Sequence, residues 1–178
     1  AGAQAVKLEG GRKRLPPYPC QQGQDRLSHP WRRQMTELKS ESDLRAVYKS
    51  PSGGAVGKDI AQIDAHFAHF ISLSPFLCIG TQDRNGKADV SPRGDPVGFV
   101  KILDQHTLAI PDRPGNNRLD TLANILANPS VGLLFIIPGF DDTLRVSGQA
   151  SLVNDPEILK GMSIKDRIPT LAIVVKVS

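Results

Sequence analysis

The sequence predicts a mainly β fold, a β-barrel with peripheral helices, and three observations support this prediction. Short segments rich in β-branched or apolar residues recur after residue 75, separated by turn-forming residues. Helical patterns are few and do not alternate with the strands, which argues against a parallel sheet. The length of 178 residues suits one domain with a single core, and 39% hydrophobic and 22% charged residues are typical of globular proteins.

The predicted strands are bounded by Gly, Pro, Asn and Asp residues, which favour turns. A tight hairpin turn is expected at Asn85-Gly86, because this pair readily adopts the backbone angles that such turns need. The predicted strand ranges are 76–82, 98–103, 107–110, 131–138, 143–153 and 170–177.

Three segments predict helices. Residues 40–48 begin with a Ser-x-x-Asp capping pattern. Residues 59–74 repeat apolar side chains at helical spacing and end before Pro75, and residues 118–127 do the same before Pro129. The expected buried positions are Ile60, Ile63, Phe67, Phe70 and Ile71 in the first of these two, and Leu119, Leu122, Ile125 and Leu126 in the second.

The positive charge of the chain is concentrated at its start. Residues 1–34 hold seven Lys or Arg against two Asp or Glu, whereas residues 35–178 hold fifteen against sixteen. The first segment has no apolar periodicity, so we expect a disordered or extended basic arm, with Met35 as a plausible natural start and residues 35–178 as the folded domain. The alternative is a basic tail that binds nucleic acid. The near-neutral domain itself gives no reason to expect a nucleic-acid or membrane partner.

Protein-based catalytic groups are hard to find in this sequence. Cys20 and Cys78 form no ligand cluster, and Cys78 lies in an apolar segment that predicts a buried free thiol in a reducing, cytoplasmic setting. His66 and His69 have a spacing that can hold a metal, but no further ligands accompany them, so ordinary surface histidines are favoured. If the protein is an enzyme, a cofactor is expected to carry the chemistry.

Two polar stretches stand out. In residues 89–100, Gly94 would let the backbone approach a ligand, and Ser91 and Arg93 would donate hydrogen bonds. The alternative is a turn in which Arg93 pairs with Asp95.

The second stretch, IPDRPGNNRLDTLANILANP at 110–129, predicts an anion site at a helix start. Asn116 or Asn117 would cap the helix, and Arg118 would stand in its first turn, where an arginine opposes the helix dipole unless an anion is bound. Arg113 would reach the same point. The alternative is a helix start satisfied by the neighbouring acidic residues Asp112 and Asp120.

Taken together, these segments resemble the pyridoxamine 5′-phosphate oxidase-related proteins, which are FMN-binding split β-barrels. The resemblance covers roughly Ser40 to Ser178, and the long Ile-Pro-Asp-Arg-Pro-Gly-Asn-Asn-Arg-Leu-Asp run is its most specific part. The other resembling segments are SPRGD…GFV, VGLLFIIPG and TLRVSGQA.

The resemblance implies FMN at a homodimer interface, with each of two sites drawing on both subunits. The strand Asp89–Gly94 would follow the isoalloxazine and ribityl groups, the segment Asp112–Arg118 would hold the phosphate, and Thr143–Val146 would bring polar side chains toward the flavin. The implied cofactor-binding residues are Asp89, Val90, Ser91, Pro92, Arg93, Gly94, Asp112, Arg113, Asn116, Asn117, Arg118, Thr143 and Arg145.

Two departures weaken the case for vitamin B6 oxidation. Asn116-Asn117-Arg118 stands where the oxidases carry a Ser-Lys or Arg-Lys motif, and the sequence ends at Ser178 without their arginine-containing C-terminal segment. We therefore expect a cytoplasmic, homodimeric FMN-dependent oxidoreductase acting on an unknown small substrate, with a nicotinamide as candidate electron donor. The alternatives are a non-catalytic flavin carrier or sensor, and a dimeric interaction protein that has lost its cofactor.

Overall fold

The computed structural model describes residues 37–48, 60–115 and 117–178, and the chain separates into two compact units, Ala1–Ser50 and Pro51–Ser178. In the first unit, α1 (Glu41–Val47) is the expected helix. The Ser40 hydroxyl accepts from the Asp43 amide at 3.2 Å, and the Asp43 carboxylate accepts from the Ser40 amide at 2.9 Å. The sequence-based capping pattern is confirmed. The predicted arm at 1–34 lies outside the described residues.

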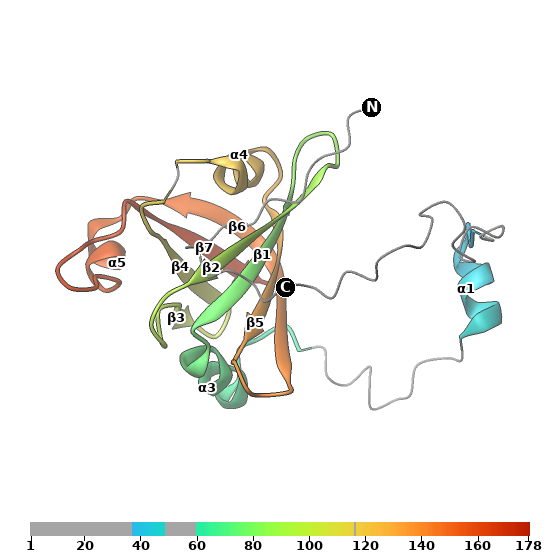
Figure 1. The fold of residues 1–178 in the computed structure, drawn as a ribbon, viewed down its shortest axis with the longest axis horizontal. Coiled ribbons are helices and arrows are strands. Elements are labelled where there is room, and N and C mark those ends of the chain that lie inside the picture. The colour runs from blue at the N-terminus through green and yellow to red at the C-terminus, as the bar shows by residue number, and fades with distance from the viewer. Residues whose placement is uncertain (1–36, 49–59, 116) are drawn as a thin grey trace, which may run out of the picture. The chain divides into compact units, whose positions relative to one another are not determined.

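A seven-stranded antiparallel sheet forms the second unit (Figure 1). Its strands are β1 (Phe76–Gln82), β2 (Ala88–Gly94), β3 (Lys101–Asp104), β4 (Thr107–Asp112), β5 (Ser130–Ile136), β6 (Thr143–Val153) and β7 (Leu171–Val177). The spatial order is β2-β1-β5-β6-β7-β4-β3, so β2 and β3 are the two edge strands. With helices around it, this sheet confirms the predicted mainly β, barrel-like fold class.

Strand alternation places the core on one face of the sheet. In β1, Leu77 and Ile79 are fully buried, whereas the alternating residues Cys78 and Gly80 lie on the outer face and are half-buried. In β6, the buried Leu144 and Val146 alternate with exposed polar residues. The expectation of a buried Cys78 is therefore wrong in degree, because the pleat turns this side chain away from the core. It remains a free thiol.

Helix α3 (Ala65–Leu73) is shorter than the predicted 59–74. It begins at Asp64, whose carboxylate accepts from the Phe67 amide at 2.8 Å. The residues before it are tied to the turn between β3 and β4: the Ile63 amide donates to the Gln105 carbonyl at 2.7 Å, and His106 Nδ1 lies 2.9 Å from the Ala61 carbonyl. Ile63 is buried but not helical, and Ile60 is exposed. His66 and His69 are exposed, in agreement with the surface interpretation.

Helix α4 (Asp120–Ala127) also differs from its prediction. It packs against β1, β2 and β6, and it buries Thr121, Leu122 and Ile125. Leu119 and Leu126, which the sequence placed on the buried face, are 58% and 75% exposed. Leu119 precedes the helix as its N-cap, and Thr121 instead of Leu126 shares the inward face with Leu122 and Ile125.

Smaller differences concern the strands and one helix. The strand predicted at 98–103 is β3 at Lys101–Asp104, because Gly98 has a positive φ of 76° and turns the chain before it. Helix α5 (Pro156–Lys160) was not predicted, although Asp155 before Pro156 is a typical helix start, and the Asp155 side chain caps it. The hairpin at Asn85-Gly86 is confirmed, with Gly86 at φ 79°. Among the described residues, no helix is long and apolar enough to cross a membrane.

Candidate functional site

Edge strand β2 presents the candidate residues 89–94 on two faces. Asp89, Ser91 and Arg93 are half-buried on the inner side of the strand. Val90, Pro92 and Gly94 alternate with them and are exposed on the outer side. The strand that the resemblance assigns to FMN binding therefore presents polar side chains on its inner side and a small apolar surface on its outer side.

Arg93 joins β2 to the end of β4. Its Nη1 donates to Asp112 Oδ1 at 2.7 Å, and both side chains are 19% exposed. β2 and β4 are not neighbours in the sheet, so this ion pair bridges the gap that the sheet leaves between them. Arg93 Nε is also buried and has no hydrogen-bond partner among the described residues. A buried donor without an acceptor is costly, and it suits a site that a polar ligand or water completes.

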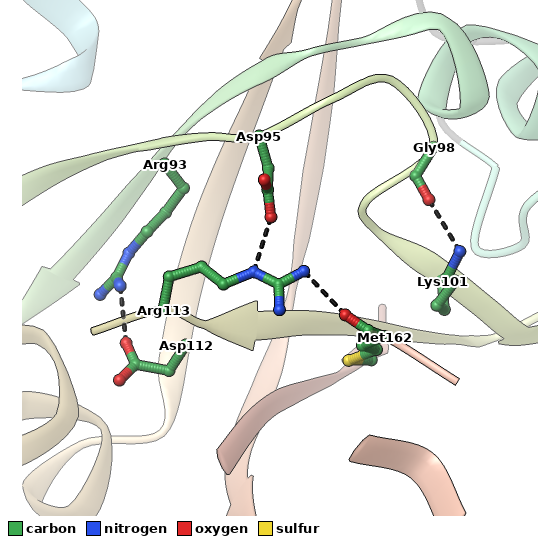
Figure 2. A network of polar contacts seen from close by, with 7 residues as sticks. All are labelled: Arg93, Asp95, Gly98, Lys101, Asp112, Arg113 and Met162. Carbon is green, nitrogen blue, oxygen red and sulfur yellow. Dashed lines mark hydrogen bonds and ion pairs between the residues drawn. The ribbon is translucent and has the colours of Figure 1, made fainter. Parts of the chain in front are cut away.

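A second ion pair crosses the same gap, but here the carboxylate lies on the β2 side and the arginine on the β4 side (Figure 2). Arg113 Nε donates to Asp95 Oδ2 at 2.7 Å, and Arg113 Nη2 donates to the Met162 carbonyl at 2.7 Å. Figure 2 shows Arg93 turned toward Asp112 and Arg113 turned toward Met162. The alternative in which Arg93 pairs with Asp95 is wrong, because each residue is paired across the gap instead.

The segment between β4 and α4 holds the remaining phosphate candidates. Asn117 has a positive φ of 56°, and Asn116 is outside the described residues. Arg118 forms an exposed ion pair with Asp120, with Nη2 and Oδ2 2.7 Å apart. The capping prediction is wrong: the N-cap is Leu119, and among the described residues no side chain caps α4. No capping side chain from the described residues therefore occupies the amides that open this helix.

Thr143 and Arg145 are exposed on the outer face of β6. Backbone pairing places Arg145 beside Leu134, Leu134 beside Cys78, and Cys78 beside Pro92, which forms one row across four strands. The next row along the strands runs from Ser147 through Gly132 and Gly80 to Val90. An open cavity of about 1290 Å³ is lined in part by these two rows.

A second, smaller cavity lies at the gap between β2 and β4. Its volume is about 180 Å³, and its lining includes Arg93, Asp95 and Arg113 together with apolar groups of Pro92, Phe99 and Pro111. The structure thus brings the candidates Arg93, Asp112 and Arg113 together. It leaves Thr143 and Arg145 on a separate face of the sheet.

Sequence reasoning missed two groups at this site. Asp95 was considered only as a partner of Arg93, and the Met162 carbonyl was not considered. The alternation of charges in Arg93-Gly94-Asp95 and in Asp112-Arg113 was a usable signal for Asp95, since two short mixed-charge segments can pair with each other. A backbone carbonyl leaves no such signal. Among the described residues, no group of three or more His, Cys, Asp or Glu is placed to hold a metal.

The fold and this site define a class of protein: an antiparallel barrel, open between two strands, with mixed-charge groups at the opening. Comparison with known families makes the assignment specific. Residues 63–177 match the family model described as pyridoxamine 5′-phosphate oxidase, and the chain belongs to this family.

Solved structures agree in fold. HupZ from Group A Streptococcus aligns with a TM-score of 0.52 at 15% identity, over 65% of this chain and 90% of that chain. A protein from Lactobacillus delbrueckii, described as a candidate pyridoxamine 5′-phosphate oxidase, aligns with a TM-score of 0.52 at 16% identity, over 68% of this chain and 94% of that chain. No curated protein matches the chain in sequence.

Proposed function

We propose that this protein binds FMN, with the flavin phosphate held between the inner side of β2 and the start of α4. The observation that carries the proposal is the state of Arg93: a largely buried guanidinium, fixed by Asp112, whose Nε has no partner among the described residues. A phosphate oxygen is a strong acceptor for such a donor. The start of α4 has no capping side chain among the described residues, and because this helix packs against β2 it offers further amide donors.

The residues present fit a phosphate group in charge as well as in hydrogen bonding. Arg118 precedes α4, and its ion pair with Asp120 is exposed, so an approaching anion can compete for the guanidinium. Asn117 would add an amide group, and Asp112 would keep Arg93 in place. When bound, FMN would supply the redox chemistry, while the chain's own residues bind it, orient it and shield it from water.

A complete site would need two copies of the chain. Thr143 and Arg145 lie on the outer face of β6, whereas Arg93 lies on the inner side of β2. The two strands are separated by β1 and β5, a distance of about 14 Å at the usual strand spacing. Because the two groups lie on opposite faces of the sheet, we propose that Thr143 and Arg145 reach a flavin bound at Arg93 from a second copy. The exposed outer face with its two neighbouring glycines, Gly80 and Gly132, is the surface that would meet that copy.

We propose an FMN-dependent oxidoreductase, acting in the cytoplasm on a small substrate with a nicotinamide as electron donor. The described residues offer no paired nucleophile and base, which is consistent with chemistry carried by the cofactor. A flavin carrier or sensor would use the same contacts, and turnover alone separates the two.

The test is a fluorescence titration of FMN with purified protein, followed by gel filtration and an absorption spectrum of the protein peak. The proposal predicts a flavin spectrum that co-elutes with protein at the mass of a dimer. NADH and NADPH are then added without oxygen, and bleaching of the flavin band indicates an oxidoreductase. A protein that quenches no FMN fluorescence and elutes without flavin would contradict flavin binding, and flavin that no nicotinamide reduces would favour the carrier.

A further inference from the structure

We propose that Asp95 is a positioning residue of the cofactor site: by holding Arg113, it fixes the gap between β2 and β4 and thereby the place of the Arg93 guanidinium. The inference rests on the proposed function. It concerns the four charged residues Arg93, Asp95, Asp112 and Arg113, called the gap cluster below.

The gap cluster replaces the backbone hydrogen bonds that β2 and β4 lack. The two strands are separated in the sheet by β1, β5, β6 and β7. The four residues of the gap cluster lie at or next to the C-terminal ends of β2 and β4. Two ion pairs of 2.7 Å each connect these ends. All four side chains are at most one-quarter exposed, so water weakens these contacts less than it weakens surface pairs.

Asp95 and Arg113 form the better anchored of the two pairs. The Asp95 amide donates to the Pro75 carbonyl at 3.1 Å, which ties it to the residue before β1. Arg113 also donates to the carbonyl of Met162, whose side chain is buried with Leu159, Ala109 and Ala172. Arg113 therefore connects the segment after β2, the end of β4 and the segment after α5. Arg93 has only Asp112 as a partner among the described residues.

The order of charges also fixes how the two ends face each other. On the β2 side, arginine precedes aspartate, and on the β4 side aspartate precedes arginine, so each cation meets an anion. A displacement that brought Arg93 toward Arg113 would set like charges together, which is unfavourable. Loss of Asp95 would remove this constraint and leave Arg113 without its carboxylate. Arg93 would then be held by one contact across a gap of undefined width.

The experiment compares FMN dissociation constants of the wild type, Asp95→Ala, Asp95→Asn, Arg113→Ala and the double variant Asp95→Ala/Arg113→Ala. We expect Asp95→Ala to weaken FMN binding on the order of tenfold, a size typical of residues coupled in one network. Asp95→Asn should recover part of this loss, because its amide oxygen still accepts from Arg113 Nε. The double variant should be no weaker than Arg113→Ala alone, because both changes break the same contact.

Two controls separate positioning from general loss of stability or charge. Val175→Ala removes buried volume from β7, four residues from Leu171, the partner of Asp112, and should lower the melting temperature without changing FMN affinity. Glu157→Ala removes a carboxylate from the exposed Lys160–Glu157 pair on α5 and should change neither the melting temperature nor the FMN affinity.

The outcomes are distinct. If the wild type binds no FMN, the proposed function fails and the role of Asp95 fails with it. If the wild type binds FMN and Asp95→Ala binds it equally well or more tightly, flavin binding stands and the positioning role is overturned. Tighter binding would show that Asp95 competes with the cofactor for Arg113. Losses of FMN affinity that are fully additive in the double variant would also overturn the positioning role of Asp95.

Discussion

Arg93 and Asp112 join two strands that share no backbone hydrogen bonds: Arg93 Nη1 donates to Asp112 Oδ1 at 2.7 Å across the opening of the barrel. Nineteen positions separate them in the sequence. The contact links the edge strand β2 to the strand whose end leads into α4. Stability and cofactor binding are thus expected to depend on the same pair, and variants can separate the two effects.

Replacing Arg93 by Met should reduce both the stability of the fold and the binding of the cofactor. Asp112 would keep a largely buried charge without its cation, which is expected to lower the free energy of unfolding by about 1–3 kcal/mol. Urea denaturation measures this change, and the double variant Arg93→Met/Asp112→Asn should lose less than the sum of the single losses. A single variant as stable as the wild type would show that the pair adds nothing to the fold.

Arg118→Ala should affect binding without affecting the fold. Arg118 and Asp120 are 56% and 57% exposed, and exposed ion pairs contribute little, so the free energy of unfolding should change by less than about 0.5 kcal/mol. Loss of a charged donor to phosphate should weaken FMN binding about tenfold or more. Asp120→Asn is the matched control, because it removes the same ion pair but leaves the arginine, and its FMN affinity should equal or exceed that of the wild type. Equal affinities of Arg118→Ala and wild type would remove Arg118 from the site.

Much of the fold was predictable because local patterns determine it. Alternating apolar residues gave the strand at 143–153 with the bounds of β6, and Ser40 with Asp43 gave the start of α1. Helix starts were less predictable where the decisive contact is distant. Residues 60–64 have a helical pattern, but hydrogen bonds to the turn at residues 105–106 hold Ala61 and Ile63 outside the helix. No pattern within the segment itself carries that information.

The candidate site was predictable as a set of segments but not as a set of contacts. The polar stretches at 89–100 and 110–129 do meet in the structure. Which arginine pairs with which aspartate depends on the curvature of the sheet and on the order of its strands, neither of which the sequence shows directly. The side of the sheet on which Thr143 and Arg145 lie was predictable in principle. Alternation along β6 separates them from the core side once the strand is recognised.

Two glycines on neighbouring strands should respond very differently to alanine. A Cβ on Gly148 would overlap the carbonyl group of Lys176 in β7, so Gly148→Ala must displace backbone and should cost about 3 kcal/mol or more. A Cβ on Gly132 would meet no atom within 4 Å, so Gly132→Ala should be neutral or slightly stabilising within one copy of the chain. Thermal unfolding of both variants under conditions that keep the protein monomeric tests this contrast. Similar losses of stability in the Gly148→Ala and Gly132→Ala variants would contradict the close packing of β6 against β7.

The hairpin between β1 and β2 should contribute to acid sensitivity. The backbone amide of Lys87, together with that of Asn85, donates to the Asp83 carboxylate and lowers its pKa below the ordinary value of 3.8. A lowered folded-state pKa means that the contribution is complete above 3.8 and is lost as the pH falls through the folded-state value. Asp83→Asn should therefore show a smaller drop in melting temperature between pH 6 and about pH 2.5 than the wild type does. A drop of the same size in both would assign the acid sensitivity to other carboxylates.

The proposed use of the outer sheet face by a second copy gives the last prediction. Leu134 lies in the row between Cys78 and Arg145, so Leu134→Glu would replace an apolar group at the contact of two copies by a carboxylate that competes for Arg145. Removing this charge from water would oppose association of the two copies. We expect this variant to elute as a monomer and to lose FMN, because Thr143 and Arg145 would no longer reach a site in the other copy. His69→Glu, which adds a charge on the exposed side of α3, is the control and should leave mass and FMN content unchanged. Light scattering coupled to gel filtration measures both quantities. A Leu134→Glu variant that stays dimeric would place the interface elsewhere, and a monomeric wild type that retains FMN would show that one copy forms the whole site.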